Sequence, residues 1–153
     1  KKQKEKTNKT MATRVWESAV IPAAINVVWD QIRPLDFKFN PNVTSATIEE
    51  KKAAAEVGGL RTVTYKDNTV QTIKLTELSD ASHTISWELV ISEPAVSYVS
   101  SAHTLKLRRI TSTGETFIEW VVDYSKDASQ EVIQDARFKG QELFKALAAA
   151  VSA

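Results

Sequence analysis

The chain of 153 residues is 42% hydrophobic and 25% charged, which is the size and composition of one soluble globular domain with its own core. It contains no cysteine, which excludes a disulfide framework, a thiolate metal site and a cysteine nucleophile, and we expect a cytoplasmic protein. The first ten residues hold five of the 20 Lys and Arg but one of the 19 Asp and Glu, so the rest of the chain is mildly acidic and we expect no nucleic-acid partner.

Residues 1–11 are predicted to form a disordered basic tail, either native or left over from cloning. Residues 1–10 offer no apolar side chain to bury, and their charges repel one another. Met11-Ala12-Thr13 resembles a natural start, and a single domain is expected over residues 12–153. No apolar run approaches the ~18 residues that cross a bilayer, so no membrane span is predicted.

The domain opens with an alternating segment at 14–21, which is typical of a strand. Pro22 then begins a predicted helix to about Arg33, and Pro34 ends it, because proline disfavours helical backbone in the residue before it. Residues 35–41 are predicted to form a second short helix or a turn. The apolar stripe of the first helix consists of Ile25, Val28, Trp29 and Ile32.

Six further strands are predicted after these helices, separated by turn-forming residues. The last strand alternates most clearly, with Trp120 and Val122 on one face and Glu119 and Asp123 on the other. We therefore expect a sheet with one face exposed to solvent and the other covered by the rest of the protein. The six strands are placed at 43–51, 59–66, 70–78, 83–92, 96–110 and 115–124.

A long final helix is predicted from a cap at Asp127 or Ser129 to about Val151. Gly140 lies in its apolar stripe. Because glycine costs ~1 kcal/mol in a helix relative to alanine, we expect Gly140 where the helix approaches the sheet closely or opens toward a cavity. The order of strand, two short helices, six strands and long helix predicts an α+β domain in which that helix covers an antiparallel sheet.

Packing motifs that support one particular fold are spread over residues 14–151. They include Ile21-Pro22, Val28-Trp29, Val57-Gly58-Gly59-Leu60-Arg61-Thr62-Val63-Thr64, Thr84-Ile85-Ser86-Trp87, Ser97-Tyr98-Val99, Leu105-Lys106-Leu107, Ile118-Glu119-Trp120, Gly140 and Leu143-Phe144-Lys145-Ala146-Leu147. In these residues the chain resembles the polyketide cyclase/dehydrase-like branch of the Bet v 1-like/START-like (SRPBCC) superfamily. The resemblance implies a helix-grip fold, with a seven-stranded curved antiparallel sheet around a long C-terminal helix and two short helices after the first strand. It also implies a cavity for a lipid or another small hydrophobic molecule.

Arg61 is the charged residue that the resemblance singles out. In an alternating strand it shares a face with Val63 and Tyr65, and enzymes similar to lachrymatory-factor synthase use an inward arginine here with a glutamate on the next strand. This sequence departs from that pattern, because the glutamate position falls on Ile73 or Lys74. A guanidinium in an apolar cavity needs an anion, so Arg61 either binds an anionic ligand group or pairs within the protein as a structural residue.

His103 shares the apolar face of its predicted strand with Ser101, Leu105 and Leu107. Histidine suits proton transfer near neutral pH, and the simpler alternative is a hydrogen-bonded core residue. His83 is the only other histidine, and no third ligand clusters with the pair, so no metal site is predicted. Neither a Walker motif nor a dinucleotide glycine pattern occurs, so no cofactor is predicted.

Taken singly, the aromatic residues are candidates for plain core, but together on a concave sheet they suit a ring-lined pocket. The preferred function is that of a carrier or sensor that binds a small lipophilic molecule, neutral or anionic. We expect the protein to be a monomer or a weak dimer. The alternative is a polyketide cyclase/dehydrase- or isomerase-like enzyme in which Arg61 stabilises an oxyanion and His103 carries a proton. A co-chaperone-like module that binds a partner protein is a third class. The predicted ligand-binding residues are Trp29, Phe37, Phe39, Arg61, Tyr65, Trp87, His103, Trp120 and Phe144.

Overall fold

A computed structural model describes residues 13–49, 53 and 55–152 of the chain. The predicted tail at 1–11 and the last two residues of the strand predicted at 43–51 lie outside the described residues. The described elements follow the chain as β1 (Arg14–Ile21), α1 (Ile25–Ile32), β2 (Val43–Ile48), β3 (Leu60–Tyr65), β4 (Val70–Ser79), β5 (Thr84–Glu93), β6 (Ser101–Arg109), β7 (Thr116–Tyr124) and α2 (Gln130–Val151).

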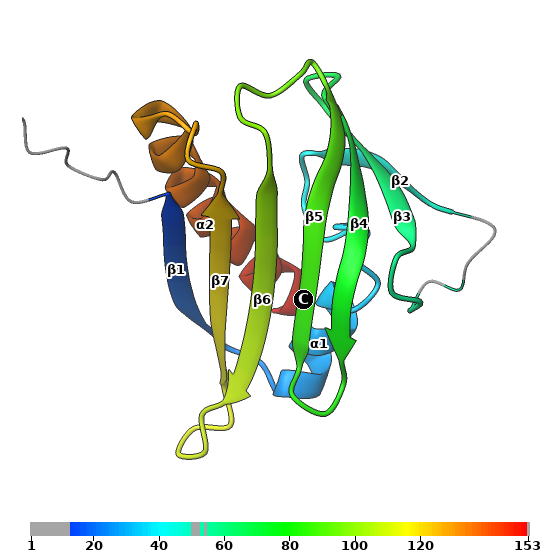
Figure 1. Ribbon diagram of the computed structural model, residues 1–153. Helices are drawn as coiled ribbons and strands as arrows, with labels where there is room; N and C mark the ends of the chain where they lie inside the picture. Colours follow the sequence, from blue (N-terminus) through cyan, green and yellow to red (C-terminus); the bar gives the residue numbers. More distant parts are fainter. Residues whose placement is uncertain (1–12, 50–52, 54, 153) are drawn as a thin grey trace, which may run out of the picture.

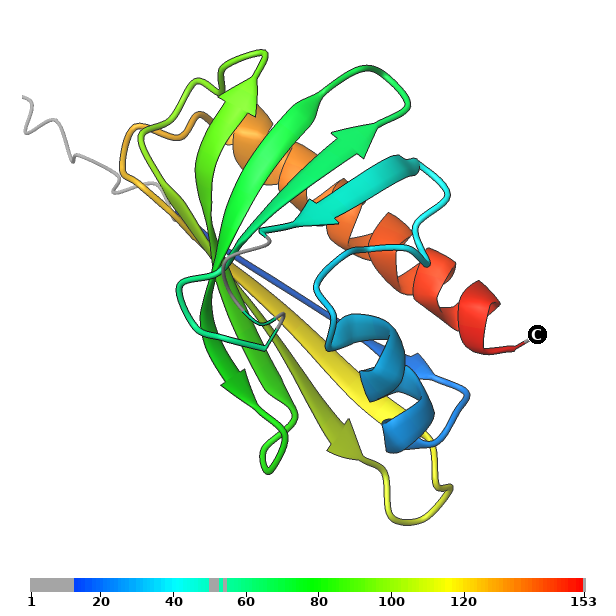
Figure 2. The same cartoon turned by 90° about the vertical axis from the view of Figure 1, so that its right-hand side faces the viewer.

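The strands form one antiparallel sheet in the order β1-β7-β6-β5-β4-β3-β2, as Figure 1 shows. The pairing of β4 with β5 shifts register between Thr72 and Ile73 and again between Leu75 and Glu77. Such irregularities bend and twist a sheet, which here curves around the helices. In Figure 2 both helices lie on the same side of the curved sheet, as in the helix-grip fold that the resemblance implied.

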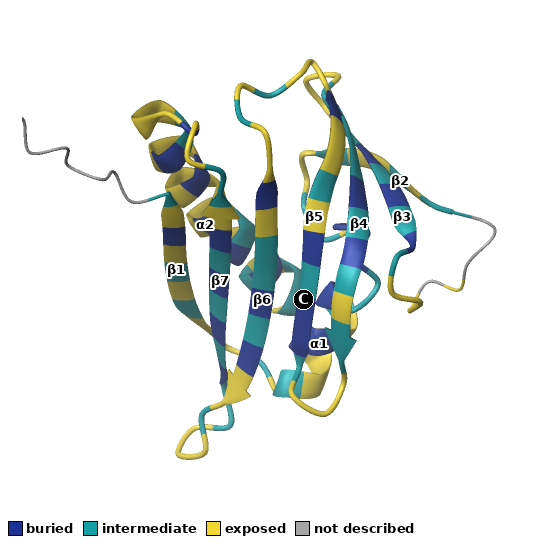
Figure 3. Ribbon diagram, in the orientation of Figure 1, coloured by how far each residue is buried: buried dark blue, intermediate teal, exposed yellow. Residues whose placement is uncertain are grey.

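Along the strands, buried and more exposed residues alternate, so the sheet has one face covered by the helices and one face open to solvent (Figure 3). In β7 the side chains of Ile118, Trp120 and Val122 are buried, while Asp123 is exposed. The covered face packs on the helices and forms the hydrophobic core. The predicted phase of this strand is therefore confirmed.

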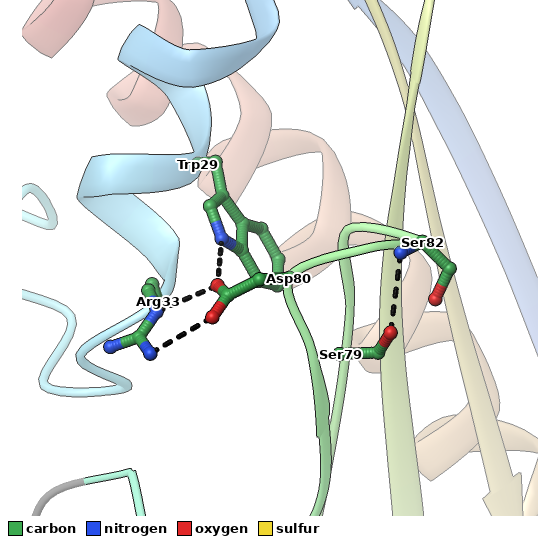
Figure 4. A network of polar contacts seen from close by, with 5 residues as sticks. All are labelled: Trp29, Arg33, Ser79, Asp80 and Ser82. Carbon is green, nitrogen blue, oxygen red and sulfur yellow. Dashed lines mark hydrogen bonds and ion pairs between the residues drawn. The ribbon is translucent and has the colours of Figure 1, made fainter.

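Helix α1 begins after its N-cap Ala24 and ends at Ile32, and its C-cap Arg33 lies directly before Pro34. A network around Asp80, in the turn between β4 and β5, holds this helix against the sheet (Figure 4). One carboxylate oxygen accepts hydrogen bonds from Trp29 Nε1 at 2.8 Å and from Arg33 Nε at 2.7 Å, and the other accepts from Arg33 Nη2 at 3.0 Å. The bonds from Arg33 and then from Trp29 lower the pKa of Asp80 to about 2, so the carboxylate stays ionised and the network persists in mild acid.

Of the two alternatives predicted for residues 35–41, the turn is confirmed and the second short helix is wrong, because these residues form a series of turns. Leu35 and Phe37 both have φ near +53°, in the left-handed region that no right-handed helix contains. Both side chains are buried, and Asp36 Oδ1 accepts a hydrogen bond from the backbone N–H of Lys38 at 3.2 Å. The turns bury both large apolar side chains of this short segment, and their left-handed backbone is incompatible with a helix.

The strand predicted from residue 96 begins only at Ser101. Before that point the backbone N–H groups bond to side chains of the β7–α2 connection. Val99 N donates to Ser125 Oγ at 3.1 Å and to Asp127 Oδ2 at 3.0 Å, and Ser100 N donates to Ser125 Oγ at 3.0 Å. These donors are no longer available to a strand ladder, so this part of the chain is a loop.

Helix α2 crosses the covered face of the sheet with one buried stripe. Its cap is Ser129, one of the two predicted, whose Oγ accepts a hydrogen bond from Val132 N at 3.2 Å. Gly140 is buried, and a Cβ built on it would lie 2.5 Å from Cε3 of Trp120. The expected close approach of helix and sheet is confirmed at this residue.

The described helices include none with the length and apolar character needed to cross a membrane.

Candidate functional site

A cavity of about 940 Å³ lies between the sheet and helix α2. Strands β3 to β7 supply one wall and α2 supplies the opposite wall. The segment before β2, the β3–β4 turn and the β5–β6 loop contribute the remainder. The side chains that line the cavity are Phe37, Asn40, Pro41, Asn42, Tyr65, Lys66, Asp67, Thr69, Gln71, Ile73, Trp87, Leu89, Val96, Ser97, Tyr98, Ser101, His103, Trp120, Tyr124, Val132, Asp135, Ala136, Phe138, Lys139, Glu142, Leu143, Lys145 and Ala146.

Three stacked rings from neighbouring strands form the centre of the sheet wall. The rings of Trp87 on β5 and His103 on β6 have centroids 5.1 Å apart and lie within 7° of parallel. His103 and Trp120 on β7 are 5.7 Å apart at 25°. We call these three residues the Trp–His–Trp stack. Trp87 and His103 are direct cross-strand partners, so the register of β5 and β6 is what sets the first contact.

His103 is an uncharged imidazole in this wall. Its Nε2 lies 3.1 Å from Ser101 Oγ, and its Nδ1 has no hydrogen-bond partner among the described residues. Burial lowers the pKa of His103 to about 3, because the charged imidazolium would lose its contact with water. The Nε1 atom of Trp120 is likewise buried without a partner in the described part of the chain.

Three tyrosines add uncharged hydroxyl groups to the same cavity. Burial raises the pKa of Tyr65, Tyr98 and Tyr124, so all three remain protonated at neutral pH. The rings of Tyr98 and Tyr124 meet edge to face, with centroids 4.9 Å apart. The cavity therefore offers neutral donors and acceptors set among aromatic rings.

Charged side chains line only the mouth of the cavity. Every charged lining residue that the structure describes is exposed, and we call this group the rim. The rim consists of Lys66, Asp67, Asp135, Lys139, Glu142 and Lys145.

Arg61 is fully buried, yet it is not among the side chains that line the cavity. Its Nε and Nη2 donate to the backbone oxygen of Pro34, both at 3.4 Å, and its Nη1 donates to that of Gly59 at 3.5 Å. Burial lowers the pKa of Arg61, and the nearby carboxylate of Asp36 opposes that shift. These hydrogen bonds go to backbone oxygens, whereas the structural alternative considered from the sequence was a neighbouring carboxylate or a position at a sheet edge.

The cavity brings together five of the nine residues predicted to bind ligand, namely Phe37, Tyr65, Trp87, His103 and Trp120. Besides Arg61, the remaining three lie elsewhere. Trp29 on α1 donates a hydrogen bond to Asp80 in the β4–β5 turn, and Phe144 is part of the buried core. Phe39 packs beside Phe37 with ring centroids 6.3 Å apart.

The unpredicted lining residues with polar groups include Tyr98, Ser101 and Tyr124. Tyr124 shares its strand face with Trp120, and Ser101 lies two residues before His103, so the alternation could have indicated both. Tyr98 had no such signal, because the loop that carries it was predicted as strand.

The described residues contain no group of three or more His, Cys, Asp or Glu side chains placed to hold a metal ion. The side chains that line the cavity offer a ligand aromatic rings, hydroxyl groups and the amide groups of Asn40, Asn42 and Gln71.

Comparison of the fold with solved structures gives clear likenesses over most of the chain. A protein from Nitrosospira multiformis matches with a TM-score of 0.77 and 23% identity, covering 89% of this chain and 94% of that one. An uncharacterised protein from Bacillus thuringiensis matches with a TM-score of 0.78 and 16% identity, covering 92% and 99%. Ara h 8.0201 matches with a TM-score of 0.71 and 22% identity, covering 90% and 96%.

These likenesses define the class of structure as a helix-grip α+β domain. More particularly, the chain has a Bet v 1-like fold, as the sequence resemblance implied. No protein-family model matches the sequence, and neither does any curated protein. At these identities the comparisons establish the fold alone.

Proposed function

We propose that this protein binds a small hydrophobic molecule in the cavity between the sheet and α2, as a carrier or sensor. The observation that supports this most is a cavity of about 940 Å³ with an aromatic stack in its wall. Small-molecule sites occupy roughly 300–1,000 Å³ and combine apolar and aromatic walls with a few polar groups. The neutral hydroxyl and ring nitrogen atoms described above are such groups.

The alternative is a polyketide cyclase/dehydrase- or isomerase-like enzyme that uses the same cavity. It would need an acid or base that exchanges protons near neutral pH. His103, with a pKa of about 3, is uncharged and a weak base there, and Arg61 faces the backbone oxygens of Pro34 and Gly59. The carboxylates that line the cavity lie on the exposed rim. These features favour binding over acid–base catalysis.

The test begins with native mass spectrometry of the purified protein, which should show a co-purified lipophile. Titration with the neutral dye Nile red then measures binding directly. The variant Ala146→Phe fills part of the cavity, because Ala146 lines it, whereas Ala149→Phe changes an exposed position on the same helix.

We expect Ala146→Phe to weaken dye binding and Ala149→Phe to leave it as in the wild type. The absence of any bound lipophile together with unsaturable dye binding, or equal binding by both variants, would show that the cavity is not the site.

A further inference from the structure

The Trp–His–Trp stack contains two polar atoms whose hydrogen-bonding capacity is unused. His103 Nδ1 and Trp120 Nε1 are both buried and have no partner in the described part of the chain. Buried side-chain polar atoms are partnered in the large majority of cases. Two such exceptions in one ring stack, both on residues that line the cavity, indicate a position where a ligand supplies the partner.

The orientation of Trp120 limits where that partner can lie. The Cε3–Cζ3 edge of its indole faces Gly140, since a Cβ on that residue would lie 2.5 and 2.6 Å from these two atoms. Nε1 belongs to the opposite edge of the indole and so points away from this contact with α2. Both nitrogens are covered by neighbouring atoms, so a ligand reaches them through a small side-chain rotation, which is common at binding sites.

The two nitrogens specify the chemistry of the group that would bind them. The indole N–H of Trp120 can only donate, so the ligand atom must be an acceptor. His103 Nδ1 donates or accepts according to how Nε2 and the hydroxyl of Ser101 share their hydrogen bond. A hydroxyl group satisfies both arrangements, because it accepts from Trp120 and either donates to or accepts from His103.

The surroundings specify that this group is uncharged. The charged lining residues lie on the exposed rim, and His103 and the lining tyrosines are neutral. An ionised ligand group at the stack would thus lose its water without meeting a counter-charge among the described lining residues, which is costly. Of the two ligand types expected from the sequence, the neutral one fits this wall.

We infer that the Trp–His–Trp stack is the recognition end of the cavity and that it takes the hydroxyl group of an uncharged lipophilic alcohol or phenol. This inference rests on the proposed function, because it names the ligand class of the same cavity. Trp120 donates to the hydroxyl oxygen, His103 forms the second hydrogen bond, and the apolar body of the ligand extends along the cavity toward the rim.

Three probes with one ring system test the inference, namely 2-naphthol, 2-methylnaphthalene and 2-naphthoate. Their dissociation constants are measured by displacement of Nile red at neutral pH, with the wild type and with His103→Phe. This substitution keeps an aromatic ring in the stack and removes both ring nitrogens. Trp120→Phe is the second variant, and circular dichroism establishes that each is folded.

We expect the wild type to prefer 2-naphthol over 2-methylnaphthalene by about tenfold, as for one or two net hydrogen bonds, and to bind 2-naphthoate most weakly. Each variant should lose most of this preference while binding 2-methylnaphthalene about as before. Trp87→Phe is the control, since it alters the stack without touching either unpartnered nitrogen, and it should affect the three probes alike.

Equal affinities for the three probes, or tightest binding of 2-naphthoate, would overturn the inference and leave the proposed function standing. So would a preference for 2-naphthol that survives in a folded His103→Phe or Trp120→Phe protein. Failure of all three probes and of Nile red to bind the wild type would instead overturn the proposed function itself.

Discussion

Gly140 lets helix α2 pack directly on the ring of Trp120. Its role comes from a close approach rather than from a special backbone conformation, because it lies inside a regular helix. Because the side chain of Gly140 is a single hydrogen atom, α2 can lie closer to the sheet at this point than any larger residue would allow.

Replacing Gly140 with alanine should destabilise the protein. Helix propensity alone would favour alanine by about 1 kcal/mol. The added methyl group would lie 2.5 Å from Trp120 Cε3, and overpacking of this kind costs about 1–3 kcal/mol. We expect a net loss in the free energy of unfolding, measured by urea denaturation. Gln141→Ala, at the exposed neighbouring position, is the control and should be near neutral. A Gly140→Ala protein more stable than wild type would contradict the close packing.

His103 should make the protein sensitive to acid. Burial lowers its pKa from 6.5 to about 3, so between these pH values the unfolded chain binds a proton that the folded chain does not. This contribution to stability is complete above pH 6.5 and is lost as the pH falls toward 3, at up to about 1.4 kcal/mol per pH unit.

The measurement compares urea unfolding of the wild type and His103→Phe from pH 7 to pH 4. The wild type should lose more stability than the variant over this range. Parallel curves for the two proteins would show that His103 is protonated equally in the folded and unfolded states.

At the scale of elements, the Asp80 network joins α1 to the turn between β4 and β5. Asp80→Ala removes the acceptor for both Trp29 and Arg33, whereas Asp80→Asn keeps an oxygen for Trp29 and loses the ion pair. We therefore expect the melting temperature to fall in the order wild type, Asp80→Asn, Asp80→Ala. Equal melting temperatures for all three would mean that the network does not stabilise the packing of α1.

Elements with a clear local pattern were predicted to within a few residues. The strand 14–21 was predicted with the bounds that it has, and the last strand differs by one residue at its start. The errors lie where distant contacts decide the conformation. Residues 35–41 bury Leu35 and Phe37 in turns, and residues before Ser101 donate to the side chains of Ser125 and Asp127.

For the whole molecule, we predict that residues 1–10 contribute nothing to the stability of the domain. They contain five lysines and no apolar side chain, and they lie outside the described residues. Deleting them should leave the melting temperature unchanged, as measured by differential scanning calorimetry at low and high salt. A fall of several degrees in the truncated protein would show that the tail contacts the domain.

The sequence by itself indicated an α+β domain and the covered face of β7, because both follow from the spacing of residues close together in the chain. The cost of glycine inside a helix also indicated a close approach at Gly140. The sequence also indicated that aromatic rings would gather inside the sheet. Only the tertiary structure decided which rings line the cavity. Trp87, His103 and Trp120 meet through the register of three strands, and the guanidinium of Arg61 meets Pro34, 27 residues earlier in the chain. The alternation of apolar and polar residues along a strand indicates which side chains are covered. What covers them depends on sheet curvature and helix position, which are set by contacts between residues far apart in the sequence.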